Sequence, residues 1–212
     1  TGNTGNTSTQ PSQIPNTGTT GDNSSGTGYE NIEPSLLLCR VSAAKTSQTI
    51  RWNPVKSADG YEIYGAKNNG KYKRLGTAGN DADKWKHKKL KKGTQYRYYV
   101  TAYKNINGRQ VTVSKSLPVY SITKGGKYGN PSKISAKRSS VSVKTKKKVS
   151  LRVKVSGKKL KKSSKKVRYV SSDPSVAKVS SKGVITGKKR GTCTVYSISQ
   201  NGLTKKIKVK VK

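Results

Sequence analysis

Acidic residues, histidine and long apolar runs are scarce in this chain of 212 residues. It has 8 Asp and Glu against 46 Lys and Arg, a single His and no Met. The longest apolar run, Leu36–Cys39, is far shorter than the roughly 18–20 residues that a membrane-spanning helix needs, so we expect no membrane insertion. Because no signal-peptide pattern is present and the first residue is not Met, we expect a piece of a longer protein.

The scarcity of titratable side chains argues against an enzyme. The one histidine, His87, has no second His and no nearby Cys to complete a metal site, so we expect a solvated surface residue. After residue 123 the single acid is Asp173, in a Ser-Asp-Pro turn. Glycosidic chemistry needs two carboxylates that face each other across a cleft, and we expect no such pair among Asp59, Glu62, Asp81 and Asp83. The sequence predicts no catalytic residue, no metal and no cofactor.

Two cysteines are present, Cys39 and Cys193, and each falls in the strand pattern of a different predicted domain. A disulfide needs Cα atoms within about 7 Å, which two separate domains rarely provide. Cys193 also alternates with Val195 on the inward face of its strand, as a small buried side chain does. We expect both thiols to be buried and unpaired.

Charge divides the chain into segments. Residues 1–33 hold three acids and no basic residue, residues 34–123 hold 18 basic and 4 acidic residues, and residues 124–212 hold 28 basic residues and one acid. Within residues 1–28, 22 are Gly, Ser, Thr or Asn, a composition typical of a flexible linker. We predict a linker over 1–33, domains over 34–123 and 131–212, and an interdomain linker over 124–130 that contains Lys124-Gly125-Gly126-Lys127.

The apolar residues follow a period of two in short runs that turn residues interrupt every 8–12 positions. Tyr61–Tyr64 and Tyr96–Ala102 alternate in this way, and Asp59-Gly60 and Asn107-Gly108 are turn signals. No window has a sustained 3.6-residue apolar period, so we expect no helix longer than about 10 residues. The pattern predicts an all-β fold made of two tandem β-sandwiches.

Two family resemblances sharpen this prediction. Trp52-Asn53-Pro54, Asp59-Gly60-Tyr61 and Gly93-Thr94-x-Tyr96-x-Tyr98 make residues 34–123 resemble a fibronectin type III domain. That resemblance implies a seven-stranded sandwich with Trp52 in its core. It also implies that the Tyr96 hydroxyl bonds to backbone near the corner before its strand. The Arg-Gly-Asp loop of some animal members is absent, so integrin-type adhesion is not supported.

The C-terminal segment, about residues 131–212, is similar to the bacterial Ig-like domain, group 2. The motifs that carry the similarity are Tyr169–Val179, Gly183-Val184-Ile185-Thr186-Gly187 and Gly191-Thr192-Cys193-Thr194-Val195. The fold class that follows is two tandem Ig-like/fibronectin-like β-sandwiches preceded by a flexible linker. The family implies a small sandwich in bacterial surface proteins, commonly in adhesins or beside secreted enzymes, and it names no ligand.

Lysine clusters are the strongest unusual signal. The segment 124–212, with 28 basic residues and one acid, attracts polyanions. Lysine outnumbers arginine 37 to 9 in the whole chain, which favours delocalised attraction over reading of a nucleic-acid sequence. The candidate polyanion-binding residues are Lys158, Lys159, Lys161, Lys162, Lys165, Lys166, Lys188, Lys189 and Arg190. A solubilising surface without a partner remains the alternative.

Outward-facing tyrosines give a second candidate site. If Tyr96 and Tyr98 face the core, Tyr99 faces solvent, and the same alternation exposes Tyr64. Tyr64, Tyr99 and Tyr103 then form a possible glycan-contacting patch, with ordinary cross-strand pairing as the alternative.

These features predict a non-catalytic C-terminal module pair of a larger bacterial protein, secreted or at the cell surface. We expect a monomer that acts as a spacer and attaches to anionic cell-envelope polymers such as teichoic acids, with nucleic acid bound only non-specifically. One alternative is an adhesin module for host acidic glycans. Another is an accessory tail of an upstream glycoside hydrolase or peptidase.

Overall fold

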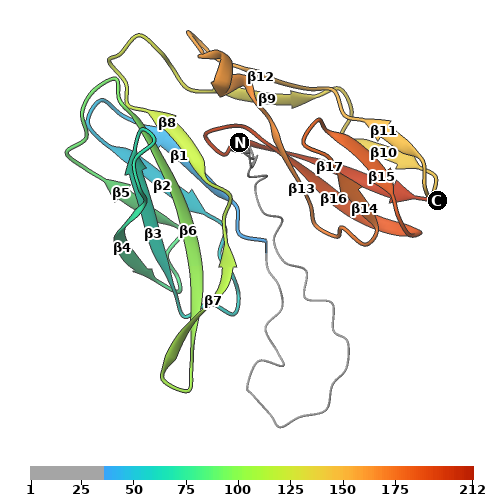
Figure 1. Ribbon diagram of the computed structural model, residues 1–212, viewed down its shortest axis with the longest axis horizontal. Coiled ribbons are helices and arrows are strands. Elements are labelled where there is room, and N and C mark those ends of the chain that lie inside the picture. Colours follow the sequence, from blue (N-terminus) through green and yellow to red (C-terminus); the bar gives the residue numbers. More distant parts are fainter. Residues whose placement is uncertain (1–35) are drawn as a thin grey trace, which may run out of the picture. The chain divides into compact units, whose positions relative to one another are not determined.

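The computed structural model describes residues 36–212 (Figure 1). The predicted linker over residues 1–33 lies outside the described residues. Within residues 36–212, strands dominate and the single helical element is a four-residue 3-10 turn, η1 (Lys162–Lys165). The all-β prediction and the absence of longer helices are therefore confirmed for this part of the chain. None of its helical segments has the length and apolarity to cross a membrane.

The first sandwich comprises β1–β8, arranged in two antiparallel sheets. One sheet has the order β1-β2-β5, and the other has the order β4-β3-β6-β7 with β8 also paired to β6. The strands are β1 (Cys39–Ala43), β2 (Gln48–Trp52), β3 (Gly60–Lys67), β4 (Lys73–Gly79), β5 (Lys84–His87), β6 (Gln95–Ile106), β7 (Arg109–Lys115) and β8 (Val119–Ile122). Eight strands are present where the resemblance implied seven, because β7 ends before Pro118, which has no N–H to donate, and β8 starts after it.

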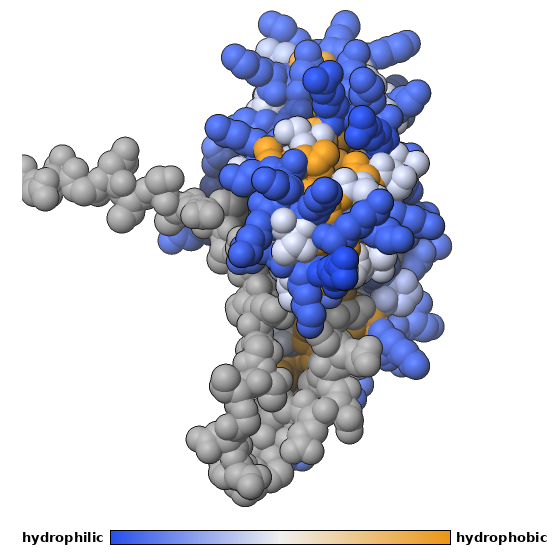
Figure 2. All heavy atoms as spheres, turned by 90° about the vertical axis from the view of Figure 1, so that its right-hand side faces the viewer, coloured by the Kyte–Doolittle hydropathy of each residue, from blue (hydrophilic) through white to orange (hydrophobic). Residues whose placement is uncertain are grey.

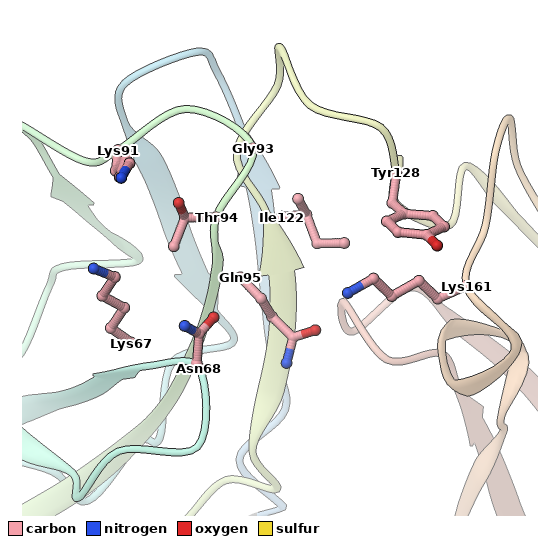
Figure 3. A pocket seen from close by; sticks show the side chains of 9 residues that line it. All are labelled: Lys67, Asn68, Lys91, Gly93, Thr94, Gln95, Ile122, Tyr128 and Lys161. Carbon is pink, nitrogen blue, oxygen red and sulfur yellow. The ribbon is translucent and has the colours of Figure 1, made fainter.

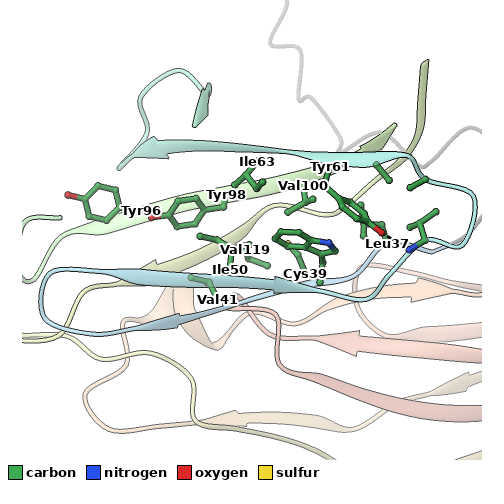
Figure 4. Packing of buried hydrophobic residues seen from close by; sticks show 14 of the residues in the cluster. Leu37, Cys39, Val41, Ile50, Tyr61, Ile63, Tyr96, Tyr98, Val100 and Val119 are labelled. Carbon is green, nitrogen blue, oxygen red and sulfur yellow. Dashed lines mark hydrogen bonds between the residues drawn. The ribbon is translucent and has the colours of Figure 1, made fainter. Parts of the chain in front are cut away.

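Aromatic and branched side chains alternate into the space between these sheets (Figure 4). Trp52 lies in this core as predicted, with its ring centroid 5.2 Å from that of Tyr61. The buried Tyr96 hydroxyl accepts a hydrogen bond of 3.1 Å from the Lys91 backbone N–H, which confirms the bond expected at that corner. The backbone N–H of Val55 donates to the Tyr61 hydroxyl at 2.8 Å, so the hydroxyl groups of both tyrosines are hydrogen-bonded.

The second sandwich comprises β9–β17. Its largest sheet has the order β10-β17-β16-β13, beside a β11-β15-β14 sheet and a β12-β9 pair. The strands are β9 (Lys133–Ala136), β10 (Ser140–Val143), β11 (Lys148–Ser150), β12 (Val153–Ser156), β13 (Arg168–Ser171), β14 (Ala177–Val179), β15 (Val184–Gly187), β16 (Gly191–Ile198) and β17 (Thr204–Val211). β10 pairs with β17 in parallel, and β16 pairs with β17 in antiparallel fashion.

The core of the second sandwich is aliphatic. Ile185, Val195 and Ile207 are fully buried, and Tyr169 contributes the one partly buried aromatic ring. Cys193 belongs to this core and Cys39 to that of the first sandwich, and both thiols are unpaired. The prediction of two buried free cysteines is confirmed. Burial raises the pKa of Cys39 to about 11 and also raises that of Cys193.

A turn of the second sandwich, Ser199–Leu203, forms hydrogen bonds with the first. The backbone N–H of Val41 donates to the Asn201 carbonyl at 2.9 Å, and that of Tyr120 donates to the Gln200 carbonyl at 2.7 Å. The half-buried Arg168 donates through its guanidinium group to the carbonyls of Pro118 and Ser199. The two sandwiches accordingly belong to one compact unit.

Candidate functional site

The lysine-rich segment Lys158–Lys166 joins β12 to β13 and contains η1. Five of its six lysines are exposed, as expected for a solvated segment. Lys161 is the exception: it is half-buried, and its Nζ lies 4.7 Å from the ring centroid of Tyr128, a cation–π contact. Tyr128 is the one exposed large hydrophobic side chain among residues 36–212.

The segment Lys188–Arg190 joins β15 to β16, and all three of its side chains are exposed. More basic residues gather around it, because the Lys146 N–H donates to the Gly187 carbonyl and the Gly187 N–H donates to the Lys147 carbonyl. Thr145 in turn donates to the carbonyl of Lys212, the last residue. This end of the sandwich therefore carries its own basic cluster.

The structure does not bring the two lysine segments together. Arg190 directly precedes the first residue of β16, whereas Arg168, two residues after Lys166, pairs with Ile198 at the last residue of β16. Eight residues of strand separate these ends, a distance on the order of 23 Å. That exceeds the screening length of about 10 Å at 0.1 M salt, so the two clusters do not act directly on the same bound charge.

A row of lysines on β17 connects these clusters, and the list of candidates from the sequence left it out. Lys206, Lys208 and Lys210 are exposed, while Ile207, Val209 and Val211 are buried. The alternation of apolar and basic residues was visible in the sequence, but its position between two hydrogen-bonded neighbours was not. Hydrophilic residues cover most of the face drawn in Figure 2, with apolar residues showing in small areas between them.

Few carboxylates are present to compensate this positive charge. The Asp173 carboxylate accepts hydrogen bonds from the Ser175 hydroxyl at 2.6 Å and from the Ser175 backbone N–H at 2.9 Å, and these bonds hold its pKa below the usual range. Both ion pairs found among the described residues lie in the first sandwich: Arg74 with Glu62 at 2.8 Å, and Arg51 with Asp83 at 3.5 Å. The lysines of the second sandwich are thus available to an external anion.

Of the three tyrosines predicted as a glycan-contacting patch, the structure places two in contact. The Tyr64 and Tyr99 rings stack with centroids 4.8 Å apart, and Lys115 Nζ lies 4.4 Å from the Tyr99 centroid. Tyr103 lies against Gly60, and four residues of β6 separate it from Tyr99, on the order of 13 Å.

Tyr72, just before β4, completes this cluster and was missed in the sequence. Its ring meets Tyr99 edge-on at 4.8 Å, and the Arg97 guanidinium carbon lies 4.5 Å from its centroid. Burial raises the pKa of Tyr72 to about 12, while a hydrogen bond to Glu62 raises that of Tyr64. The rings therefore pack on one another and on cationic side chains, the arrangement expected of cross-strand pairing.

His87 corrects another prediction. The expected solvated histidine is half-buried on β5, and its Nδ1 lies 3.0 Å from the Tyr98 hydroxyl. Its ring also contacts Trp85 and Tyr96 at centroid distances of 5.6 and 6.0 Å. Burial lowers its pKa. The alternation Trp85-Lys86-His87 places the imidazole on the same inward-leaning face as the indole, which explains the error.

A polar recess of about 310 Å³ adds three lysines to the basic surface (Figure 3). Lys67, Lys91 and Lys161 line it, and Figure 3 shows the Lys161 side chain directed toward Gln95 with Tyr128 beside it. No carboxylate lines the recess. Residues 36–212 contain no group of three or more His, Cys, Asp or Glu side chains placed to hold a metal ion.

Comparison with known proteins finds a family match for the C-terminal segment. Residues 132–211 match the family model "Bacterial Ig-like domain (group 2)". No curated protein sequence matches the chain. This match agrees with the group assigned to the C-terminal segment from its motifs, and such domains are generally non-catalytic modules that occur in extracellular or surface bacterial proteins.

Solved structures similar to part of the chain include the FN5 domain of Drosophila Lar. The two share 18% sequence identity, and the match covers 44% of this chain and 100% of the FN5 domain, with a TM-score of 0.36. A myokine structure shares 19% identity over 44% of this chain and 100% of that one, also with a TM-score of 0.36. A beta-1,2-glucanase from Parabacteroides distasonis shares 20% identity over 43% of this chain and 13% of that one, with a TM-score of 0.36.

Proposed function

We propose that the chain is a non-catalytic module pair of a larger bacterial surface or secreted protein. In this proposal the first sandwich is a fibronectin type III domain that serves as a spacer. The second sandwich attaches the protein to anionic polymers of the cell envelope, such as teichoic acids. The observation that carries the proposal is the exposed lysine surface of the second sandwich, which extends over both ends of β16 and along β17 with one acid, Asp173, in residues 124–212.

The test is binding of the full chain to purified teichoic acid as a function of salt. Lysines that bind a polyanion displace the counterions condensed on it. The logarithm of the affinity should therefore fall steeply and linearly with the logarithm of the salt concentration. A neutral glycan of similar length is the control and should not bind. Absence of teichoic acid binding at low salt would leave the inert spacer as the function.

Host acidic glycans are the second candidate ligand, favoured by the recess at Lys161. Its three lysines, its amide side chains Asn68 and Gln95, and the exposed Tyr128 ring combine charge, hydrogen-bonding groups and an aromatic face. Pockets that bind sugars and other small ligands commonly use such a mixture. Replacing Lys161 by Gln should weaken binding of a sulfated oligosaccharide more than replacing the exposed Lys162 by Gln, although both variants lose one charge. Equal effects would remove this candidate.

A further inference from the structure

The lysines of β17 form a regularly spaced row. Lys206, Lys208 and Lys210 are every second residue of a strand whose intervening side chains are buried. A strand rises about 3.3–3.4 Å per residue, so successive lysine Cα atoms lie about 6.7 Å apart. β10 and β16 hold β17 in register from both sides, which fixes the spacing.

Hydroxyl groups flank two of these lysines in the same register. Lys208 pairs with Ser140 on β10 and with Thr194 on β16, and Lys210 pairs with Ser142 and Thr192. Paired residues on neighbouring strands lie about 4.7–4.9 Å apart, and their side chains share one face of the sheet. A lysine flanked on both sides by a hydroxyl residue therefore occurs twice along β17.

The repeat length selects the ligand. A polymer in which a three-carbon polyol links successive phosphates has six main-chain bonds per repeat: P–O, O–C, C–C, C–C, C–O and O–P. Two peptide residues also contain six main-chain bonds and span about 6.6–7.2 Å when extended. One phosphate of such a polymer can therefore lie over each lysine in turn, with its oxygens within reach of an ammonium group and of hydroxyl donors.

We propose that the β17 ladder, defined as Lys206, Lys208 and Lys210 with the flanking Ser140, Ser142, Thr192 and Thr194, is a binding track for an extended polyol phosphate chain. Further basic residues lie beyond both ends of the track. Lys212 and the Lys188–Arg190 segment lie beyond Lys210, and Lys165 and Lys166 lie near the end of β16 that pairs with the start of β17. This inference rests on the proposed function and adds to it a defined ligand class and a defined strand.

Single-stranded nucleic acid has the same six-bond repeat, but the ladder suits it less well. Proteins that bind single strands add aromatic side chains on which successive bases stack. The ladder has one ring, Tyr196, opposite Lys206, whose Nζ lies 5.9 Å from the ring centroid. The other two lysines have hydroxyl residues as neighbours, which match an oxygen-rich polyol and offer no stacking surface.

Two matched triple variants of the full chain test the track. One carries Lys206→Gln, Lys208→Gln and Lys210→Gln, and the other carries Lys158→Gln, Lys159→Gln and Lys162→Gln, outside the track, so that each loses three exposed positive charges. Calorimetry with poly(glycerol phosphate) should show at least a tenfold greater loss of affinity for the ladder variant. The slope of log affinity against log salt should also decrease by about 2 for that variant, because about 0.7 counterion is released per phosphate neutralised on a flexible chain. Heparin, whose charges follow another spacing, should lose affinity equally for both variants.

Other outcomes separate the track from the general proposal. Equal losses of poly(glycerol phosphate) affinity in both variants would overturn the track and keep diffuse attachment. No binding of this polymer to the unmodified chain at low salt would overturn both. Tighter binding of an oligo(dT) strand of equal charge would overturn the polyol assignment. Circular dichroism checks that the variants fold, and a Lys→Thr triple provides a second ladder variant with high strand propensity.

Discussion

The first sandwich buries aromatic rings and places two of its four acids beside arginines, whereas the second buries valine and isoleucine and has one acid among many lysines. Trp52, Tyr61 and Tyr98 fill the first core, and Ile185, Val195 and Ile207 fill the second. Period-two alternation is enough to specify both, since each strand needs only an apolar face that turns inward. The outward face is under no such constraint, and that is where the two sandwiches differ in charge.

The largest expected difference comes from the cores. Trp52→Ala should lower the free energy of unfolding of the first sandwich by about 3–5 kcal/mol, because it removes a large buried ring and leaves a cavity. Ile207→Val should lower that of the second by only about 0.5–1.5 kcal/mol. Both tryptophans, Trp52 and Trp85, belong to the first sandwich, so tryptophan fluorescence during denaturation reports on that sandwich alone.

The same measurement tells whether the sandwiches unfold independently. If they do, Ile207→Val leaves the fluorescence transition in place and shifts only a later or earlier step seen by circular dichroism. A fluorescence transition that moves with Ile207→Val would show a single cooperative unit and would contradict the comparison between two cores.

The turn that joins the sandwiches gives a second test. Gly202 has a φ of 86°, and an added Cβ would collide with the backbone of Cys39 and Arg40. Because this methyl group overpacks the contact, Gly202→Ala should lower the free energy of unfolding by about 1–3 kcal/mol beyond the strain that a positive φ imposes on alanine. Gly108→Ala is the matched control, because Gly108 has a φ of 75° and open space around it. Equal melting temperatures for the two variants would show that the contact with Cys39 contributes nothing.

The sequence predicted what depends on local alternation and missed what depends on pairing between distant strands. Val209, Trp52 and Tyr96 lie where the pattern placed them. The Tyr72–Tyr99 contact requires β3 to pair with both β4 and β6, and the position of Ser140 beside Lys208 requires that β10 pair with β17 in parallel. Neither register follows from local propensity. The two lysine segments were grouped because both are basic, although β16 separates them.

Salt should act on the two sandwiches unequally. The second sandwich carries 26 basic residues in the 82 residues from 131 to 212, so self-repulsion lowers its stability and added salt screens it. The first has both ion pairs, which salt weakens slightly. Hydrogen exchange measured by mass spectrometry should show slower exchange in β16 and β17 at about 1 M than at about 0.01 M salt, with little change in β3 and β6. Parallel changes in both would contradict this contrast.

Mild acid should act mainly on the first sandwich, through His87. Burial lowers the folded-state pKa of His87 below its ordinary value of about 6.5, so the unfolded state takes up a proton at a higher pH than the folded state does. Stability should therefore fall as pH decreases through about 6.5 and level off below the folded pKa. Denaturation followed by tryptophan fluorescence between about pH 5 and 7 measures this, and His87→Gln should remove it. Glu62 and Asp173, with lowered pKa values, respond only at lower pH.

The smallest expected effect is a change in how fast a thiol reagent labels each of the two cysteines. Burial raises the pKa of Cys39 to about 11 and raises that of Cys193 as well, so near neutral pH both are protonated and poor nucleophiles. A thiol reagent should therefore label the native chain only through opening of each sandwich, with one cysteine reporting on each. Trp52→Ala should accelerate labelling of Cys39, and Ile207→Val should slightly accelerate labelling of Cys193. Mass spectrometry of the labelled peptides gives both rates in one sample. Rapid labelling of either thiol in the unmodified chain would mean that its strand opens far more readily than its burial implies.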